Sequence, residues 1–205
     1  MTTRKRTAIL ISGRGTNMAA LIAAARAPDF PAEIVLALSN KPDAPGLSLA
    51  KSAGIAAAAI DQKIYAGRDE FERSMQAMLD IHRIELICLA GFMRILSAPF
   101  VGRWRGRIIN IHPSLLPAFR GLDTHRRALE AGVRVHGCTV HFVEPELDAG
   151  PIIAQSAVSI LAGDTAERLA ARVLEKEHQL YAQALALVAS GRVRLEDGPT
   201  RITAA

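Results

Sequence analysis

Aromatic residues and cysteines are scarce in this sequence of 205 residues. Only 4% of the residues are Phe, Trp or Tyr, and there are two cysteines. Proteins that bind single-stranded nucleic acid use aromatic side chains on which bases stack. Nucleic-acid binding is therefore not indicated, despite a net charge of +5. Cys88 and Cys138 lie in apolar runs typical of buried thiols, and they indicate neither a disulfide framework nor a zinc knuckle.

Long hydrophobic runs are also lacking. The apolar stretch after the basic residues 4–6 covers only residues 7–11, which is too short for the core of a signal peptide. No segment has the length of apolar sequence that crosses a bilayer. We therefore expect a cytoplasmic protein without membrane contact. Half of the residues are hydrophobic, which is enough for a folded core.

Short apolar runs alternate with amphipathic segments of helical length in the first half of the sequence. This rhythm predicts βαβ units and a largely parallel sheet. A helix is expected between the second and third strands, where Phe71, Met75 and Leu79 recur at helical spacing. The predicted buried strands are residues 7–12, 33–39, 86–90 and 107–111.

The second half has a different pattern. Residues 135–143 and 151–160 are predicted to be longer strands that pair antiparallel across an acidic loop. The last helix is predicted to start at Asp164 as N-cap, with Glu167 as capping-box partner, and to end before Gly191. Residues from Arg192 onward are expected to form a tail. The fold class is α/β: a Rossmann-like, open, mostly parallel twisted sheet with helices on both faces and an antiparallel C-terminal strand pair, in one domain over residues 1–205.

A glycine-rich turn, Ser12-Gly13-Arg14-Gly15-Thr16-Asn17, joins the first strand to a helical pattern. Such a turn presents backbone N–H groups to an anion. The dinucleotide fingerprint is not met, because Met18 stands where its third glycine belongs, and the Walker lysine is missing. The turn therefore fits one phosphate, with Thr16 and Asn17 as side-chain donors. A tight turn without a ligand is the other interpretation.

The run from Ile109 to Pro117 delivers an amide and an imidazole from an apolar strand into a turn with two prolines. Proline fixes its own φ and restricts the residue before it, so His112 has little backbone freedom. Asn110 comes two residues earlier in the same apolar strand pattern. This fixed geometry is typical of a site for acid-base chemistry.

The acidic loop of residues 144–151 contains two candidates for a partner of His112. Either Asp148 or Glu146 beside the imidazole would favour its protonated form. Alternatively, the loop is a solvated acidic turn. His112, His141 and Asp148 could also be three ligands of a metal, but the turn explains His112 without one, and we expect no metal.

Two further features each have two interpretations. Glu177 lies on the apolar stripe of the last helix, so it needs a partner, either an arginine of the fold or a substrate hydroxyl or amine. Residues 91–96 follow a predicted strand at its carboxyl end and place apolar side chains around Arg94, which suits a flat heteroaromatic ring but also ordinary core. His125 and His136 are expected at the surface or at a helix cap.

These features together resemble the family of folate-dependent formyltransferases over nearly the whole chain. Residues 110–117 match the element shared by such enzymes, whereas the glycine loop and residues 121–125 resemble the members that formylate glycinamide ribonucleotide. The motifs that carry the resemblance are Ser12-Gly13-x-Gly15-x-Asn17, Ala90-Gly91-Phe92-Met93-Arg94-Ile95-Leu96, Asn110-Ile111-His112-Pro113-Ser114-Leu115-Leu116-Pro117, Leu147-Asp148-x-Gly150-Pro151 and Glu177-His178.

The resemblance implies a one-step transfer of formyl from 10-formyltetrahydrofolate to the primary amine of glycinamide ribonucleotide, in purine synthesis, without a metal or a covalent intermediate. It implies that Asn110 and protonated His112 stabilise an oxyanion and that Asp148 keeps His112 charged and oriented. By the same resemblance, the substrate is held by Gly15, Thr16 and Asn17 at its phosphate and by Glu177 at its ribose. The folate contacts that it implies are Arg68, Met93, Arg94, Ile95, Leu96 and Asn110.

Family members with other functions are expected to differ from this chain mainly in length. A methionyl-tRNA formyltransferase should carry an extra C-terminal barrel, a formyltetrahydrofolate hydrolase an extra N-terminal regulatory domain, and sugar-nucleotide formyltransferases are also expected to be longer. A binding module that senses a phosphorylated metabolite or folate is the alternative outside enzymes, but it would not need Asn110, His112 and Asp148 at one point. The sequence is compatible with a monomer or a homodimer.

Overall fold

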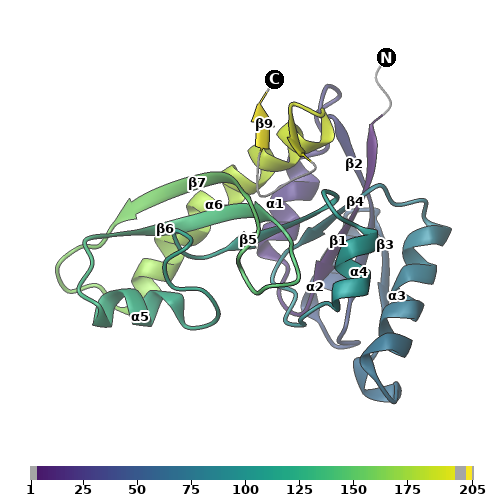
Figure 1. Ribbon diagram of the computed structural model, residues 1–205, viewed down its shortest axis with the longest axis horizontal. Coiled ribbons are helices and arrows are strands. Elements are labelled where there is room, and N and C mark those ends of the chain that lie inside the picture. Colours follow the sequence, from purple (N-terminus) through teal and green to yellow (C-terminus); the bar gives the residue numbers. More distant parts are fainter. Residues whose placement is uncertain (1–3, 197–201, 205) are drawn as a thin grey trace.

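The computed structural model describes residues 4–196 and 202–204, and its centre is a seven-stranded sheet in the order β3-β2-β1-β4-β5-β6-β7 (Figure 1). The first five strands in that order pair parallel, and the last two join the sheet antiparallel. The strands are β1 (Lys5–Ile11), β2 (Ala32–Ser39), β3 (Ala56–Ala59), β4 (Leu86–Leu89), β5 (Ile108–His112), β6 (Val135–Phe142) and β7 (Ile152–Ser159).

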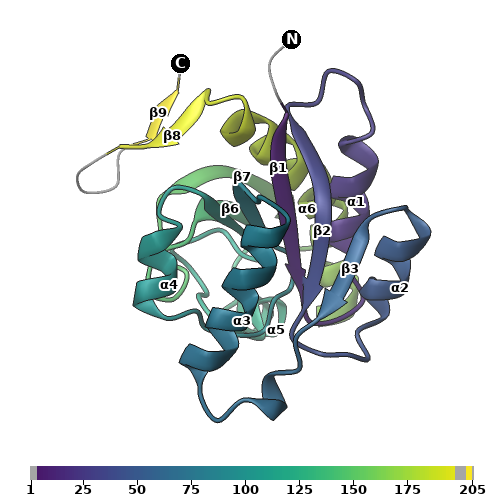
Figure 2. The same cartoon turned by 90° about the vertical axis from the view of Figure 1, so that its right-hand side faces the viewer.

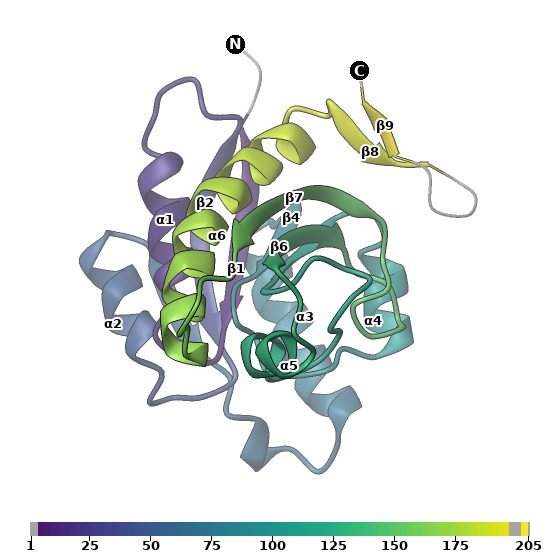
Figure 3. The same cartoon turned by 90° about the vertical axis from the view of Figure 1, so that its left-hand side faces the viewer.

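Helices cover both faces of the parallel part, and the side chains of β1 show why. Ile9 and Ile11 pack into one hydrophobic cluster, and Ala8 and Leu10 pack into the other, so alternate residues are buried on opposite faces. The helices α1 (Thr16–Ala24), α2 (Pro45–Ser52) and α6 (Ala166–Ala189) lie on one face, and α3 (Arg68–Ile81) and α4 (Ala98–Arg103) on the other (Figures 2 and 3).

The remaining elements are short. A 3₁₀ turn, η1 (Gln62–Ile64), precedes α3, and α5 (Thr124–Glu130) packs beside α6. Together these elements confirm the predicted fold class, and the predicted antiparallel pair is β6 with β7. No helix in residues 4–196 is long and apolar enough to cross a membrane.

The start of α6 lies one residue later than predicted. The N-cap is Thr165, whose hydroxyl accepts a hydrogen bond from the amide of Arg168. Asp164 does not cap the helix, because its carboxylate accepts the amide of Leu161 and pairs with the guanidinium of Arg172. Glu167 is consequently not in the capping-box position that we predicted.

Two other regions differ from the prediction. The segment after Arg192 is not a plain tail, because β8 (Val193–Leu195) pairs antiparallel with β9 (Ile202–Ala204). The edge strand β3 was not predicted either, since its four residues are all alanine, the residue with the highest helix propensity. Backbone pairing with β2 selects the strand conformation there.

The carboxyl ends of the parallel strands lie at one edge of the sheet. At this edge β1 is followed by the glycine loop, β4 by Gly91, and β5 ends at His112. The strand order reverses between β1 and β4, and open α/β sheets bind their ligands at such a position.

Candidate active site

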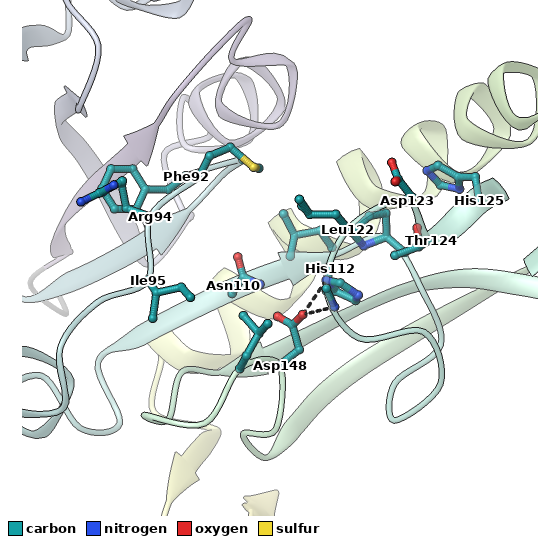
Figure 4. Close-up of a pocket in the computed structure, with 16 residues that line it drawn as sticks. Phe92, Arg94, Ile95, Asn110, His112, Leu122, Asp123, Thr124, His125 and Asp148 are labelled. Atoms are coloured by element: carbon teal, nitrogen blue, oxygen red, sulfur yellow. Dashed lines mark hydrogen bonds and ion pairs between the residues drawn. The ribbon is translucent and has the colours of Figure 1, made fainter. Parts of the chain in front are cut away.

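A cavity of about 600 Å³ opens at the carboxyl ends of β4 and β5. Four segments line it: residues 91–95, 110–113, 121–125 and 147–148. In Figure 4, Asn110, His112 and Asp148 lie between the segment with Phe92 to Ile95 on one side and the segment with Leu122 to His125 on the other. The fold thus brings together the three residues that the sequence proposed for catalysis.

His112 is the last residue of β5, and its side chain is 7% exposed. Its Nδ1 lies 3.4 Å from a carboxylate oxygen of Asp148, and its Nε2 lies 3.0 Å from the carbonyl oxygen of Phe119. A carbonyl oxygen only accepts, so Nε2 carries a proton. An imidazolium at this position can donate to both neighbours.

Asp148 is held by the loop between β6 and β7. One carboxylate oxygen accepts the backbone amide of Gly121 at 2.8 Å, and the residue adopts a left-handed conformation with φ of 49°. Gly150 permits the tight return of this loop, because a Cβ there would lie 1.9 Å from the carbonyl oxygen of Phe142. Glu146, the other predicted candidate, is exposed and pairs with Arg120 instead.

Asn110 has a buried partner that the sequence did not indicate. Its Nδ2 lies 3.1 Å from Nε2 of His141, whose Nδ1 donates to the carbonyl oxygen of Phe142 at 2.7 Å. His141 is therefore the Nδ1–H tautomer, and its Nε2 accepts one N–H of the Asn110 amide. Burial lowers the pKa of His141, which is consistent with a neutral ring. The alternation of polar residues on β6 was the available signal.

Large apolar side chains surround the cavity and remain exposed. Met93 and Ile95 are each 59% exposed, Leu122 is 74% exposed and Leu147 is 51% exposed. Exposed apolar side chains gathered at one opening are typical of a ligand site. Arg94 lines the same cavity, and Leu96 lines a smaller neighbouring cavity of about 100 Å³.

Arg68 is placed differently from the other predicted folate residues. It is the first residue of α3 and not part of a loop. It is not among the described residues that line either cavity.

The glycine loop forms a second polar cluster with α6. Gly15 is the N-cap of α1 with φ of 75°, a conformation that glycine adopts without strain. Asn17 donates from Nδ2 to Glu177 at 2.6 Å. Burial raises the pKa of Glu177, and the hydrogen bond from Asn17 opposes part of that increase. The partner of this buried carboxylate is therefore Asn17 of the glycine loop and not an arginine of the fold.

Ser12 connects the glycine loop to the cavity. Its backbone amide donates to the carbonyl oxygen of Gly91 at 3.0 Å, and its hydroxyl accepts the amide of Met93 at 2.7 Å. The cluster of Gly15, Thr16 and Glu177 does not itself line the cavity among the described residues.

Two histidines differ from the sequence interpretation. His136 is 1% exposed rather than at the surface, and its ring packs edge-on against those of Phe119 and His125. His125 is half-buried and lines the cavity. Both cysteines are buried and unpaired, as expected. In residues 4–196, no three His, Cys, Asp or Glu side chains are arranged to hold a metal ion.

Comparison with known proteins identifies the family. Residues 5–185 match the family model described as formyl transferase. Because this match covers most of the sequence, the chain belongs to the formyl transferase family.

Several of its relatives are phosphoribosylglycinamide formyltransferases. It is 42% identical over 189 residues to the phosphoribosylglycinamide formyltransferase of Escherichia coli (strain K12), covering 92% of this chain and 89% of that protein. The crystal structure of the phosphoribosylglycinamide formyltransferase from Brucella melitensis is 54% identical, with a TM-score of 0.89 and coverage of 92% and 97%.

Longer relatives contain a segment similar to this chain. The trifunctional purine biosynthetic protein adenosine-3 of Gallus gallus is 55% identical over 194 residues, which is 95% of this chain but 19% of that protein. The chain therefore spans 14% to 19% of the length of the trifunctional relatives that it matches.

Proposed function

We propose that this protein transfers the formyl group of 10-formyltetrahydrofolate to the primary amine of phosphoribosylglycinamide, in purine biosynthesis. The observation that carries the proposal is the convergence of Asn110, His112 and Asp148 beside an apolar cavity at the switch point of the sheet. Similarity to phosphoribosylglycinamide formyltransferases supports the choice of substrates.

The two halves of the chain have different tasks in this proposal. The N-terminal half holds the substrate phosphate through Gly15, Thr16 and Asn17, and Glu177, which α6 contributes from the C-terminal half, accepts hydrogen bonds from the ribose hydroxyls. The C-terminal half supplies folate binding and catalysis. The residues that contact the folate are Arg68, Met93, Arg94, Ile95, Leu96 and Asn110.

The apolar rim supports this assignment of the folate site. Flat heteroaromatic rings bind between apolar side chains with a few polar groups that fix their orientation. Met93, Ile95 and Leu147 provide such side chains, and Asn110 provides a polar group at the inner wall.

Asn110 and His112 act on the transition state. Attack by the amine converts the planar formyl carbon to a tetrahedral one and places negative charge on its oxygen. His141 takes one N–H of Asn110, which leaves the second N–H to donate to that oxygen. Protonated His112 is the second donor, and preorganised donors of this kind are usually among the largest contributions to catalysis.

Asp148 acts through His112. Its carboxylate is held by the amide of Gly121, so it is fixed before substrate arrives. In that position it pairs with Nδ1 of His112 and orients the ring. A bound water then carries the proton from the attacking amine to the nitrogen of the leaving folate.

The experiment that tests the function is a formyl-transfer assay on the purified protein. The protein is mixed with 10-formyltetrahydrofolate, with and without phosphoribosylglycinamide, and loss of the formyl group is followed by folate absorbance. Turnover that requires the ribonucleotide supports the proposal. Turnover with water alone indicates a hydrolase, and no turnover indicates a binding module or another acceptor.

We also propose that the chain works as one cytoplasmic domain over residues 1–205, as a monomer or a homodimer. Its partners in this proposal are the two small substrates, without nucleic acid or membrane and without a metal.

A further inference from the structure

The turn that follows His112 is held by a buried hydroxyl on the neighbouring strand. Thr139 pairs with His112 in the register of β5 and β6, and it is fully buried. Its hydroxyl donates to the carbonyl oxygen of Ser114 at 2.6 Å and accepts the amide of Leu116 at 3.0 Å. One side chain thus fixes both ends of the segment between the two prolines.

The edge strand β7 completes this network. Nε2 of Gln155 donates to the Thr139 hydroxyl at 2.9 Å and to the carbonyl oxygen of Leu116 at 2.9 Å. A threonine hydroxyl has one proton and two lone pairs, and all three are used here. Such a saturated buried network rigidifies the groups that it joins.

The network continues to the ring of His112. The hydroxyl of Ser114 donates to the carbonyl oxygen of Ala118 at 2.6 Å. The next residue, Phe119, has φ of 54°, and its carbonyl oxygen is the acceptor for Nε2 of His112. The acceptor that sets the orientation of the imidazole therefore lies at the end of a hydrogen-bonded path from Thr139.

We propose that Thr139 is a positioning residue for His112, acting through Ser114 and the carbonyl group of Phe119. This inference rests on the proposed function for its effect on turnover, but not for its effect on the imidazole. Thr139 does not line the cavity among the described residues, so it reaches the reaction only through the placement of His112. Its loss leaves the buried amide of Leu116 with no acceptor.

The test compares Thr139→Val, which keeps the shape and removes the hydroxyl, with Thr139→Ser, which keeps the hydroxyl. Thr7→Val is the matched control, because Thr7 is also fully buried and its hydroxyl donates to a backbone carbonyl, near the amino end of β1. The first readout is the ¹H–¹⁵N spectrum of the histidine rings, in which the Nε2 signal of His112 is assigned by its loss in His112→Gln.

We expect Thr139→Val to shift or broaden the His112 signal and to lower kcat between about tenfold and a hundredfold with KM nearly unchanged, since small displacements of a catalytic group have effects of this size. Thr139→Ser should have the wild-type His112 signal and kcat. Thr7→Val should also leave the signal and kcat unchanged, although it should lose about as much stability as Thr139→Val. An unchanged His112 signal in folded Thr139→Val overturns the proposal.

A second variant covers the case in which Thr139→Val does not fold. Gln155→Met removes the outer donor of the network from an exposed position on β7. A shift of the same His112 signal supports the network, and an unchanged signal contradicts it. Because the spectra need no substrate, they decide the question even if the wild-type protein transfers no formyl group, a result that would contradict only the proposed function.

Discussion

His112 ends β5, Asp148 lies in the loop between β6 and β7, and the two meet with Nδ1 3.4 Å from the carboxylate oxygen. The contact is buried, with side-chain exposures of 7% and 8%. The other ring nitrogen faces the carbonyl oxygen of Phe119, so acceptors stand on both sides of the imidazole. Only the doubly protonated ring can donate to both.

Replacement of His112 by alanine should lower turnover at least about a hundredfold, the low end of general-acid contributions, while ligand affinity stays nearly constant. The measurement is kcat together with a binding titration. His82→Ala is a suitable control, because His82 caps α3 away from the cavity. Normal turnover by the His112 variant would contradict the mechanism.

Asp148→Asn should lower turnover. The amide still accepts from Gly121, but the carboxylate that pairs with Nδ1 of His112 is lost. Glu146→Gln, on the same loop and paired with Arg120, should leave kcat unchanged. If the two variants have the same kcat, the carboxylate of Asp148 does not act on the histidine.

Glu177→Gln should separate a stability effect from a binding effect. Burial raises the pKa of Glu177 above 4.5, so the folded state binds more protons than the unfolded chain, and stability falls as pH rises through the folded-state value. The glutamine keeps an acceptor for Asn17 and removes this slope. Urea unfolding should therefore show that the stability of the variant, relative to wild type, is higher at neutral pH than at pH 4.5. The KM for phosphoribosylglycinamide should increase.

His136 should destabilise the protein in acid. Burial, followed by repulsion from His125, lowers the pKa of His136 from 6.5 to about 4. The neutral His136 ring makes its full contribution to the free energy of unfolding above pH 6.5. This contribution, roughly 3 kcal/mol at most, is lost as pH falls towards 4. His136→Phe keeps a ring beside Phe119 and should have a flatter pH dependence of unfolding between these values. Equal slopes for the variant and wild type would contradict the assignment.

Both thiols should be inert in the folded protein. Burial raises the pKa of Cys88 and that of Cys138 to about 12, so almost no thiolate is present at neutral pH. A chromogenic disulfide reagent should react with neither cysteine until the protein is unfolded in guanidinium chloride. Rapid reaction with the native protein would show that one of the two is accessible.

The sequence predicted four of the five parallel strands, the antiparallel pair and the turn after His112, because these depend on local patterns. Apolar runs mark β1 and β5, and the two prolines mark the turn after His112. The elements that it missed depend on neighbours. β3 is a strand because its backbone pairs with β2. The N-cap of α6 is Thr165 rather than Asp164, because the carboxylate of Asp164 pairs with Arg172.

The partners of the site residues were equally beyond local reasoning. Nothing near Asn110 in the sequence indicates His141, and nothing near Glu177 indicates Asn17, since each contact joins distant segments. Glu177 was nevertheless recognisable as a residue in need of a partner, because a carboxylate on an apolar helix face is costly unless it is hydrogen-bonded.

β5 pairs parallel with β4 on one side and antiparallel with β6 on the other. The hairpin of β6 and β7 joins strands that are close in sequence. The parallel strands require crossovers and therefore depend on contacts between more distant residues, and structures of that kind fold more slowly. Asn110 and His112 belong to the strand between these two parts, and Asp148 arrives with the hairpin. The three residues therefore meet only where the two parts of the sheet pair, between β5 and β6.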